Sequence, residues 1–236
     1  MRILALDSCG KTASAAIYDG KVVAEVYTDT PMTHSSTLLP SAEWLLLSAE
    51  MKISDMDYIA ATVGPGSFTG VRIGMSAAKG MAFGAGVKCI GVSSLYAAAY
   101  AARDCKGLVC AVMDARCGQV YNANFRVDNG TIERICEDRA ISIAELIEEV
   151  RGEENIMFVG DGAILCRDRF SENGIPCRIV REGRIGVSAG DVALAAAESV
   201  DTAVTPEVFA VNYIRLSQAE RELNEKLAKK NTEEKQ

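Results

Sequence analysis

The stretch V-G-P-G-S-F-T-G-V-R-I-G-M-S-A-A-K-G-M-A-F-G-A-G, residues 63–86, organises the prediction of the fold. An apolar run from Tyr58 to Val63 predicts a buried strand that stops at Gly64-Pro65-Gly66. A helical pattern begins directly afterwards, with Ser67 as the expected N-cap. Backbone N–H groups point out of such a turn, where the helix dipole is positive. The loop is therefore either a phosphate-facing loop or a tight turn without a ligand.

The spacing of these glycines differs from two common phosphate-binding motifs. It is not G-x-x-x-x-G-K-[ST], because Lys79 lies nine residues beyond Gly70. It is also not the G-x-G-x-x-G fingerprint of dinucleotide-binding folds. Neither motif supports phosphate binding by this loop.

The helix after the loop carries a row of small residues, Gly70, Gly74, Ala78 and Ala82. Residues four apart share a helix face, so this row lets another element approach the backbone closely. Each glycine inside a helix costs about 1 kcal/mol relative to alanine, which suggests close packing. Composition alone favours packing on the chain's own sheet over packing on a partner.

Length and charge bound the class of protein. A chain of 236 residues with 49% hydrophobic composition can bury a substantial core, as one large domain or two small ones. Its formal net charge of -7 repels a phosphate backbone. Tight nucleic-acid binding by this chain alone is therefore not expected.

The cysteines and the apolar runs indicate where the protein works. Its eight cysteines include no C-x-x-C pair and lie inside apolar patterns, which predicts reduced core residues. The apolar run before Asp7 is too short for a signal peptide. No uncharged run approaches the ~18 residues of a membrane span. We expect a soluble, cytoplasmic protein with no membrane contact.

The order of predicted elements occurs twice along the chain. Each copy reads strand, strand, strand, helix, strand, helix, strand, helix, which is hard to obtain by chance. The first copy has strands at 2–6, 14–18, 22–28, 58–63 and 87–92, with helices from His34, from Ser67 and from Ser94 to about Arg103. The second copy has strands at 108–113, 119–127, 131–136, 156–159 and 178–180, with helices at 142–150, from Ala163 and at 188–200.

The repeated unit has the ribonuclease-H-like layout. Two such units in tandem resemble the actin, Hsp70 and sugar-kinase (ASKHA) architecture, an α/β fold. The predicted lobes are 1–104 and 108–204, and residues 205–236 are expected to form a C-terminal helix and tail packing back on the surface. In that architecture a nucleotide lies between the lobes. The positions that would face its phosphates are Asp7, Ser8, Thr12, Gly64, Gly66 and Ser67.

Several fragments together resemble the bacterial TsaB (YeaZ) family over nearly the whole chain. They are D-S-C-G-K-T-A-S-A-A-I at 7–17, H-S-S-T-L-L-P at 34–40, G-P-G-S-F-T-G-V-R-I-G at 64–74 with A-K-G at 78–80, V-S-S-L at 92–95, D-A-R at 114–116 and T-P-E-V-F-A-V-N-Y-I-R at 205–215.

The resemblance implies a subunit of the machinery that makes threonylcarbamoyladenosine next to the anticodon of tRNAs reading codons that begin with A. In that family a TsaD-type paralogue carries out the transfer, and a TsaE-type ATPase joins the complex. Contact with tRNA is then expected only through the complex.

The resemblance also implies a non-catalytic chain that needs no cofactor. TsaD-type proteins hold a metal with a His-x-x-x-His pair, and the matching positions here are Ser94 and Ala98. The chain's one histidine, His34, fits a capping or surface residue better than a catalytic one, and its neighbour Ser35 says nothing about geometry. Without an H-E-x-x-H motif there is no support for a protease. The expectation is no metal site and no catalytic residue.

In TsaB-like proteins the first-lobe helices pack against TsaD, or against a second TsaB as a homodimer. This implies an outward role for part of both helices and predicts that Gly74→Glu or Ala78→Glu abolishes association without unfolding the chain. A self-sufficient nucleotide-binding ATPase of the actin-like fold stays the alternative. The predicted interface residues are His34, Leu38, Ser41, Leu45, Gly70, Ile73, Gly74, Ala77, Ala78 and Met81.

Overall fold

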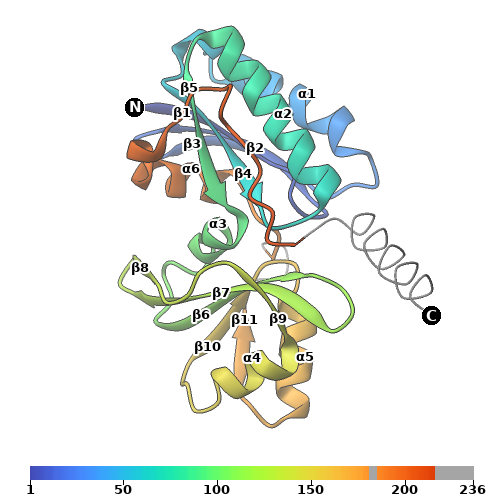
Figure 1. The fold of residues 1–236 in the computed structure, drawn as a ribbon. Helices are drawn as coiled ribbons and strands as arrows, with labels where there is room; N and C mark the ends of the chain where they lie inside the picture. Colours follow the sequence, from blue (N-terminus) through green and yellow to red (C-terminus); the bar gives the residue numbers. More distant parts are fainter. Residues whose placement is uncertain (181–184, 216–236) are drawn as a thin grey trace, which may run out of the picture.

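The computed structural model describes residues 1–180 and 185–215, which form two sheets with helices packed around them (Figure 1). The first sheet has five strands in the order β3-β2-β1-β4-β5. β1, β2 and β3 are antiparallel neighbours, whereas β4 and β5 run parallel to β1. The strands are β1 (Arg2–Asp7), β2 (Ala13–Asp19), β3 (Val22–Thr28), β4 (Tyr58–Gly64) and β5 (Lys88–Ser93).

The second sheet repeats the first. Its order is β11-β10-β6-β7-β8, with β9 pairing to β7, and β6 takes the central place that β1 has in the first sheet. This repeated order confirms the duplicated ribonuclease-H-like fold. The strands are β6 (Gly107–Asp114), β7 (Gln119–Asp128), β8 (Thr131–Arg134), β9 (Arg139–Ser142), β10 (Ile156–Val159) and β11 (Cys177–Ile179).

The helices cover both faces of the first sheet, which explains why β1 is apolar without alternation. Leu4 and Leu6 pack in the same core cluster as Leu38 and Leu45 of α1. Ile3, one residue away, faces a different cluster that contains much of α6. The helices are α1 (His34–Ser48), α2 (Phe68–Ala85), α3 (Ser94–Tyr100), α4 (Ile143–Glu149), α5 (Ala163–Glu172) and α6 (Ala189–Glu198).

Helix α6 follows the second sheet in sequence but packs on the first (Figure 1). The N–H of Ala189 donates to Ser14 Oγ at 2.8 Å, and the N–H of Gly190 donates to Glu25 Oε1 at 2.9 Å. The alanines of this helix permit the close approach. The division of the chain into folding units at 104 and 204 stays a prediction.

Two predicted elements differ from the structure. The expected strand Thr131 to Cys136 ends at Arg134, and a separate strand, β9, follows before α4. The C-terminal helix expected from Thr205 is wrong for residues 205–215, which contain no helix. Thr205 precedes Pro206, and a residue before proline is disfavoured in the helical region. The rest of the predicted tail, 216–236, lies outside the described residues.

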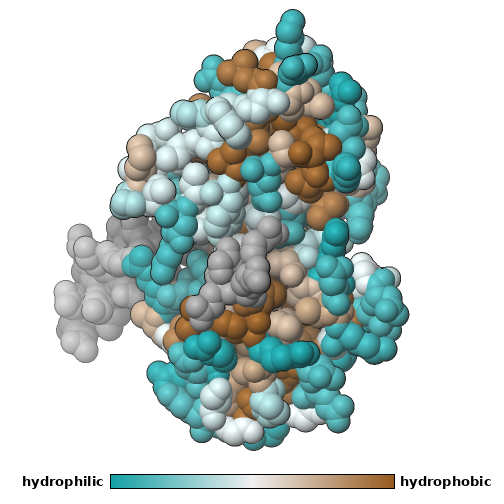
Figure 2. Space-filling model, turned by 180° about the vertical axis from the view of Figure 1, so that it is seen from behind, coloured by the Kyte–Doolittle hydropathy of each residue, from teal (hydrophilic) through white to brown (hydrophobic). Residues whose placement is uncertain are grey.

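The surface and the helix lengths bear on membrane contact. On the face seen in Figure 2, hydrophobic residues form separate clusters among hydrophilic ones. Within the described part of the chain, no helix is both long enough and apolar enough to span a bilayer.

Candidate functional site

The glycine loop is shaped by close backbone contacts. A Cβ on Gly66 would lie 2.5 Å from the carbonyl oxygen of Cys9, and a Cβ on Gly64 would lie 2.9 Å from that of Asn212. Gly64 also has a φ of 109°, a conformation that favours glycine. Ser67 is the N-cap of α2, as predicted, because its Oγ accepts the N–H of Gly70 at 3.2 Å. The glycines therefore let two other backbone segments approach.

The polar side chains at the end of β1 form hydrogen bonds inside the protein. Asp7 Oδ1 accepts the hydroxyl of Thr62 at 2.7 Å and the N–H of Cys9 at 3.2 Å. Burial raises the pKa of Asp7, although these hydrogen bonds partly offset it. Ser8 Oγ donates to the carbonyl of Gly70 at 2.8 Å. Thr12 is buried as well, under the turn at Gly186.

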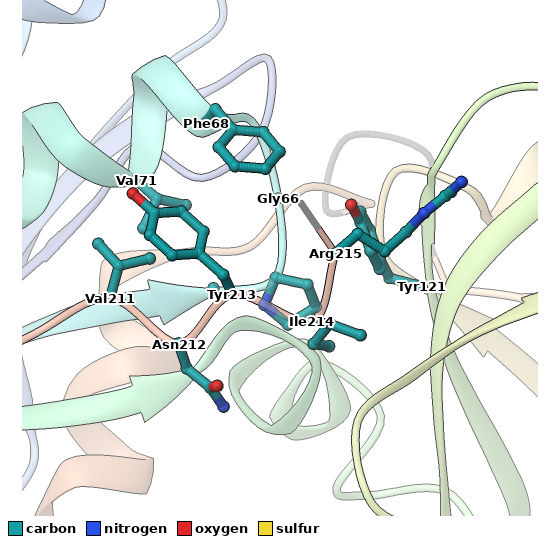
Figure 3. Close-up of a pocket in the computed structure, with 11 residues that line it drawn as sticks. Gly66, Phe68, Val71, Tyr121, Val211, Asn212, Tyr213, Ile214 and Arg215 are labelled. Atoms are coloured by element: carbon teal, nitrogen blue, oxygen red, sulfur yellow. The ribbon is translucent and has the colours of Figure 1, made fainter. Parts of the chain in front are cut away.

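The C-terminal segment, residues 205–215, crosses the glycine loop with its last five residues (Figure 3). The N–H of Asn212 donates to the carbonyl of Val63 at 2.8 Å. The cavity left between this segment, the loop and Tyr121 of the second lobe is about 10 Å³, whereas ligand pockets hold about 300–1,000 Å³. Of the residues predicted to face phosphate, Gly64 and Gly66 line this small cavity, and the phosphate-facing role of all six stays a prediction. Of them, only Ser67 is exposed, and its Oγ already accepts a hydrogen bond.

The two positions on α3 that the resemblance matches to a metal-binding pair carry no metal ligand. Ser94 and Ala98 are both buried and neither carries an imidazole. Nowhere in residues 1–180 and 185–215 do three or more His, Cys, Asp or Glu side chains gather as a metal site. His34 makes a hydrogen bond of 2.9 Å between its Nε2 and the carbonyl of Gly10, while Ser35 Oγ pairs with Thr33 Oγ1. The structure thus brings no nucleophile to His34.

Buried thiols add no nucleophile either. All eight cysteines are free, and burial raises the pKa of Cys89 to about 11 and that of Cys166 to about 12. Because the thiolate is the reactive form, these side chains are inert near neutral pH.

The small-residue row of α2 faces the chain's own sheet. A Cβ on Gly70 would overlap the carbonyl oxygen of Ser8, and a Cβ on Gly74 would lie 2.7 Å from Ser8 Oγ. Ala78 and Ala82 are fully buried. The interpretation from composition is confirmed, and the outward placement of Gly70, Gly74 and Ala78 is wrong.

Two predicted interface residues on α1 are also internal, because Leu38 and Leu45 are each only 1% exposed. The other five predicted residues are partly exposed, namely His34, Ser41, Ile73, Ala77 and Met81. Spacing alone chose the wrong row on α2 because it shows which residues share a face, and not whether that face packs on the chain's own sheet.

A groove of about 550 Å³ separates α1 from α2 on the outer surface. It is lined by His34, Ser35, Leu38, Leu39, Thr69, Arg72, Ile73, Ser76 and Ala77. Large apolar side chains on the same helices are exposed, with Trp44 at 60%, Leu47 at 70% and Phe83 at 75%. The sequence-based prediction of the interface did not include these three residues. The run Leu45-Leu46-Leu47 was the available signal, since three consecutive leucines cannot all face one core.

Comparisons with known proteins agree with this fold. A family model described as TsaD, tRNA N6-adenosine threonylcarbamoyltransferase, matches residues 26–236. A solved structure titled "YeaZ from Pseudomonas aeruginosa" superposes with a TM-score of 0.74 at 25% identity, covering 90% of this chain and 99% of that one. The chain is thus a TsaD-like protein with two ribonuclease-H-like lobes.

Two curated relatives narrow the family. The tRNA threonylcarbamoyladenosine biosynthesis protein TsaB of Escherichia coli (strain K12) is 34% identical over 197 residues, 81% of this chain and 83% of the relative. TsaB of Bacillus subtilis (strain 168) is 32% identical over 174 residues, 73% of this chain and 76% of the relative. The chain belongs to the TsaB (YeaZ) family of tRNA threonylcarbamoyladenosine biosynthesis proteins.

Proposed function

We propose that this chain is the non-catalytic subunit that binds and supports a TsaD-type transferase. The complex would transfer a threonylcarbamoyl group to the adenosine next to the anticodon of tRNAs that read codons beginning with A. The names of the TsaB relatives support the pathway. We further propose that the chain works in the cytoplasm. We also propose that it contacts tRNA only through the complex, because its net charge of -7 repels a phosphate backbone.

The observation that carries the proposal is the loss of the metal ligands in an otherwise retained fold. By the resemblance, Ser94 and Ala98 match the positions where TsaD-type proteins are expected to carry imidazoles, and both side chains are buried. The loop beneath the C-terminal segment leaves only about 10 Å³. The absence of imidazoles at these two positions supports an inactive paralogue over the alternative of a self-sufficient ATPase.

The outer face of α1 and α2 is the proposed surface for the transferase. Exposed Leu39 lines a groove of about 550 Å³, and Phe83 is exposed farther along α2. Clustered apolar surface of this kind is typical of protein–protein contacts. A second copy of the chain would use the same helices, and a TsaE-type ATPase would join the resulting complex.

Reconstitution tests the proposal. Purified TsaD-type and TsaE-type proteins, tRNA and threonylcarbamoyl-adenylate are combined with and without this chain, and modified adenosine is measured by mass spectrometry. We expect modification only when the chain is present, and none from the chain alone. ATP turnover by the isolated chain that Asp7→Asn abolishes would instead support the ATPase.

A further inference from the structure

Arg72 stands at the edge of the groove with its guanidinium held in place. It lies on α2 and lines the groove together with Leu38 and Ile73. Its Nε donates to the hydroxyl of Tyr213 at 2.7 Å. Its Cζ lies 5.5 Å from the ring centre of Tyr213 and 5.9 Å from that of Phe68, within cation–π range.

Tyr213 is itself anchored, so it can fix Arg72. Its ring stacks on Phe68, with ring centres 5.2 Å apart and planes at 14° (Figure 3). The neighbouring backbone is tied to the first lobe by the hydrogen bond from Asn212 to Val63. Further back, Lys79 Nζ donates to the carbonyl of Phe209 at 3.0 Å. A side chain held in this way loses less entropy when it binds a partner.

The positive charge of Arg72 has no carboxylate beside it. Other arginines of the chain pair with acids, for example Arg126 with Glu153 at 3.0 Å and Arg151 with Glu148 at 2.6 Å. Among residues 1–180 and 185–215, Arg72 makes no such ion pair, and its only hydrogen bond uses Nε. Within the described part of the chain its two terminal amino groups donate no hydrogen bond, and a carboxylate is the acceptor that fits a guanidinium best.

We propose that Arg72 binds a carboxylate on the transferase, and that Tyr213 is the residue that positions it. The partner segment would place an Asp or Glu on Arg72 and an adjacent apolar side chain in the groove over Leu39 and Ile73. The inference rests on the proposed function and adds the chemistry of the partner. Charge complementarity across a rim supplies association rate and specificity, so salt should weaken the contact.

Arg72→Gln tests this contact, with Arg169→Gln as the matched control. Arg169 is an exposed arginine on α5 in the second lobe. Affinity for the TsaD-type protein is measured by calorimetry at low and high salt. We expect Arg72→Gln to weaken binding about tenfold at low salt, and to reduce the salt dependence. Arg169→Gln should bind as the wild type does. Arg72→Lys, which keeps the charge but not the planar fork, should fall between them.

Tyr213 variants separate positioning from folding. Tyr213→Phe keeps the ring and loses the hydrogen bond, so a loss of about threefold is expected, whereas Tyr213→Ala should approach Arg72→Gln. The readout specific to positioning is the salt dependence, which should fall in Tyr213→Ala. A change confined to the melting temperature, with wild-type affinity and salt dependence, would overturn the role of Tyr213.

The outcomes distinguish this inference from the proposed function. If the wild type binds and Arg72→Gln binds equally tightly with the same salt dependence, the inference fails and the proposed function stands. If the wild type does not bind the transferase, the proposed function fails and takes the inference with it. If the chain alone forms a dimer that Arg72→Gln dissolves in sedimentation experiments, while binding to the transferase is unchanged, Arg72 contacts a second copy and the inference is overturned.

Discussion

The two faces of α2 differ in how closely their residues pack against the rest of the chain. The inner face carries Gly70 and Gly74, which touch Ser8 so closely that a Cβ would not fit. The outer face carries Arg72, exposed beside the groove, and Phe83, exposed farther along the helix. The row of small residues on α2 therefore allows close packing within this fold. The candidate interface is instead indicated by apolar side chains that are exposed.

The largest expected effect comes from the inner face. Gly74→Glu should unfold the chain or cost several kcal/mol, because the side chain would collide with Ser8 and bury an unpaired charge. Circular dichroism and thermal melting measure this. It reverses the sequence-based prediction that Gly74→Glu leaves the fold intact, and a melting temperature near the wild-type value would show that the inner face is not closed.

The groove between the outer face of α2 and α1, to which Leu39 belongs, should respond in the opposite way. Leu39→Glu places a charge in the groove on a side chain that is already 46% exposed, so the fold should persist while binding to the TsaD-type protein falls at least about tenfold. Ile135→Glu is the control, because Ile135 is 51% exposed on the second lobe. Co-elution and calorimetry measure both variants. Equal losses from both would mean that the groove has no special role.

Buried Asp7 should make the stability of the protein depend on pH. Its pKa is raised in the folded state by burial, so the folded protein binds a proton more readily than the unfolded one. The contribution of Asp7 to the stability of the folded protein should therefore become more favourable as pH falls from above its folded pKa toward its unfolded pKa. Denaturant unfolding at several pH values, compared with Asp7→Asn, should show this contribution in the wild type only. Parallel curves for the two proteins would contradict it.

The smallest expected effect is a stabilisation on the outer side of α2. Gly80 has open space where a Cβ would be, so Gly80→Ala should gain about 0.5–1 kcal/mol from helix propensity alone. The melting temperature should rise by roughly 1–4 °C. A fall in melting temperature would mean that Gly80 is packed closely, as on the inner face of α2, and is not in open space.

The repeated strand order was predictable because hydrophobic runs and turn residues are local signals. The hairpin at Asp19-Gly20 and the N-cap at Ser67 are examples, and both occur in the structure. Helix α6 was placed in the chain correctly, but its packing on the first sheet depends on contacts with Ser14 and Glu25, far away in sequence.

The candidate site was less predictable, because exposure depends on tertiary packing. Gly74 and Phe83 both lie in one apolar helix, and only the position of Ser8 shows which face is internal. The C-terminal segment matched a family fragment in sequence, yet its place over Gly64 became visible only in the structure. Its approach uses backbone hydrogen bonds, such as that from Asn212 to Val63, which leave no mark on residue patterns.

Hydrogen exchange on the chain with and without the TsaD-type protein tests the central claim most directly. The claim predicts slower exchange in α1 (His34–Ser48) and α2 (Phe68–Ala85) when the partner is present. Exchange in β8 and α5 of the second lobe should not change. Protection confined to the second lobe, with α1 and α2 unaffected in a complex that does form, would contradict the account.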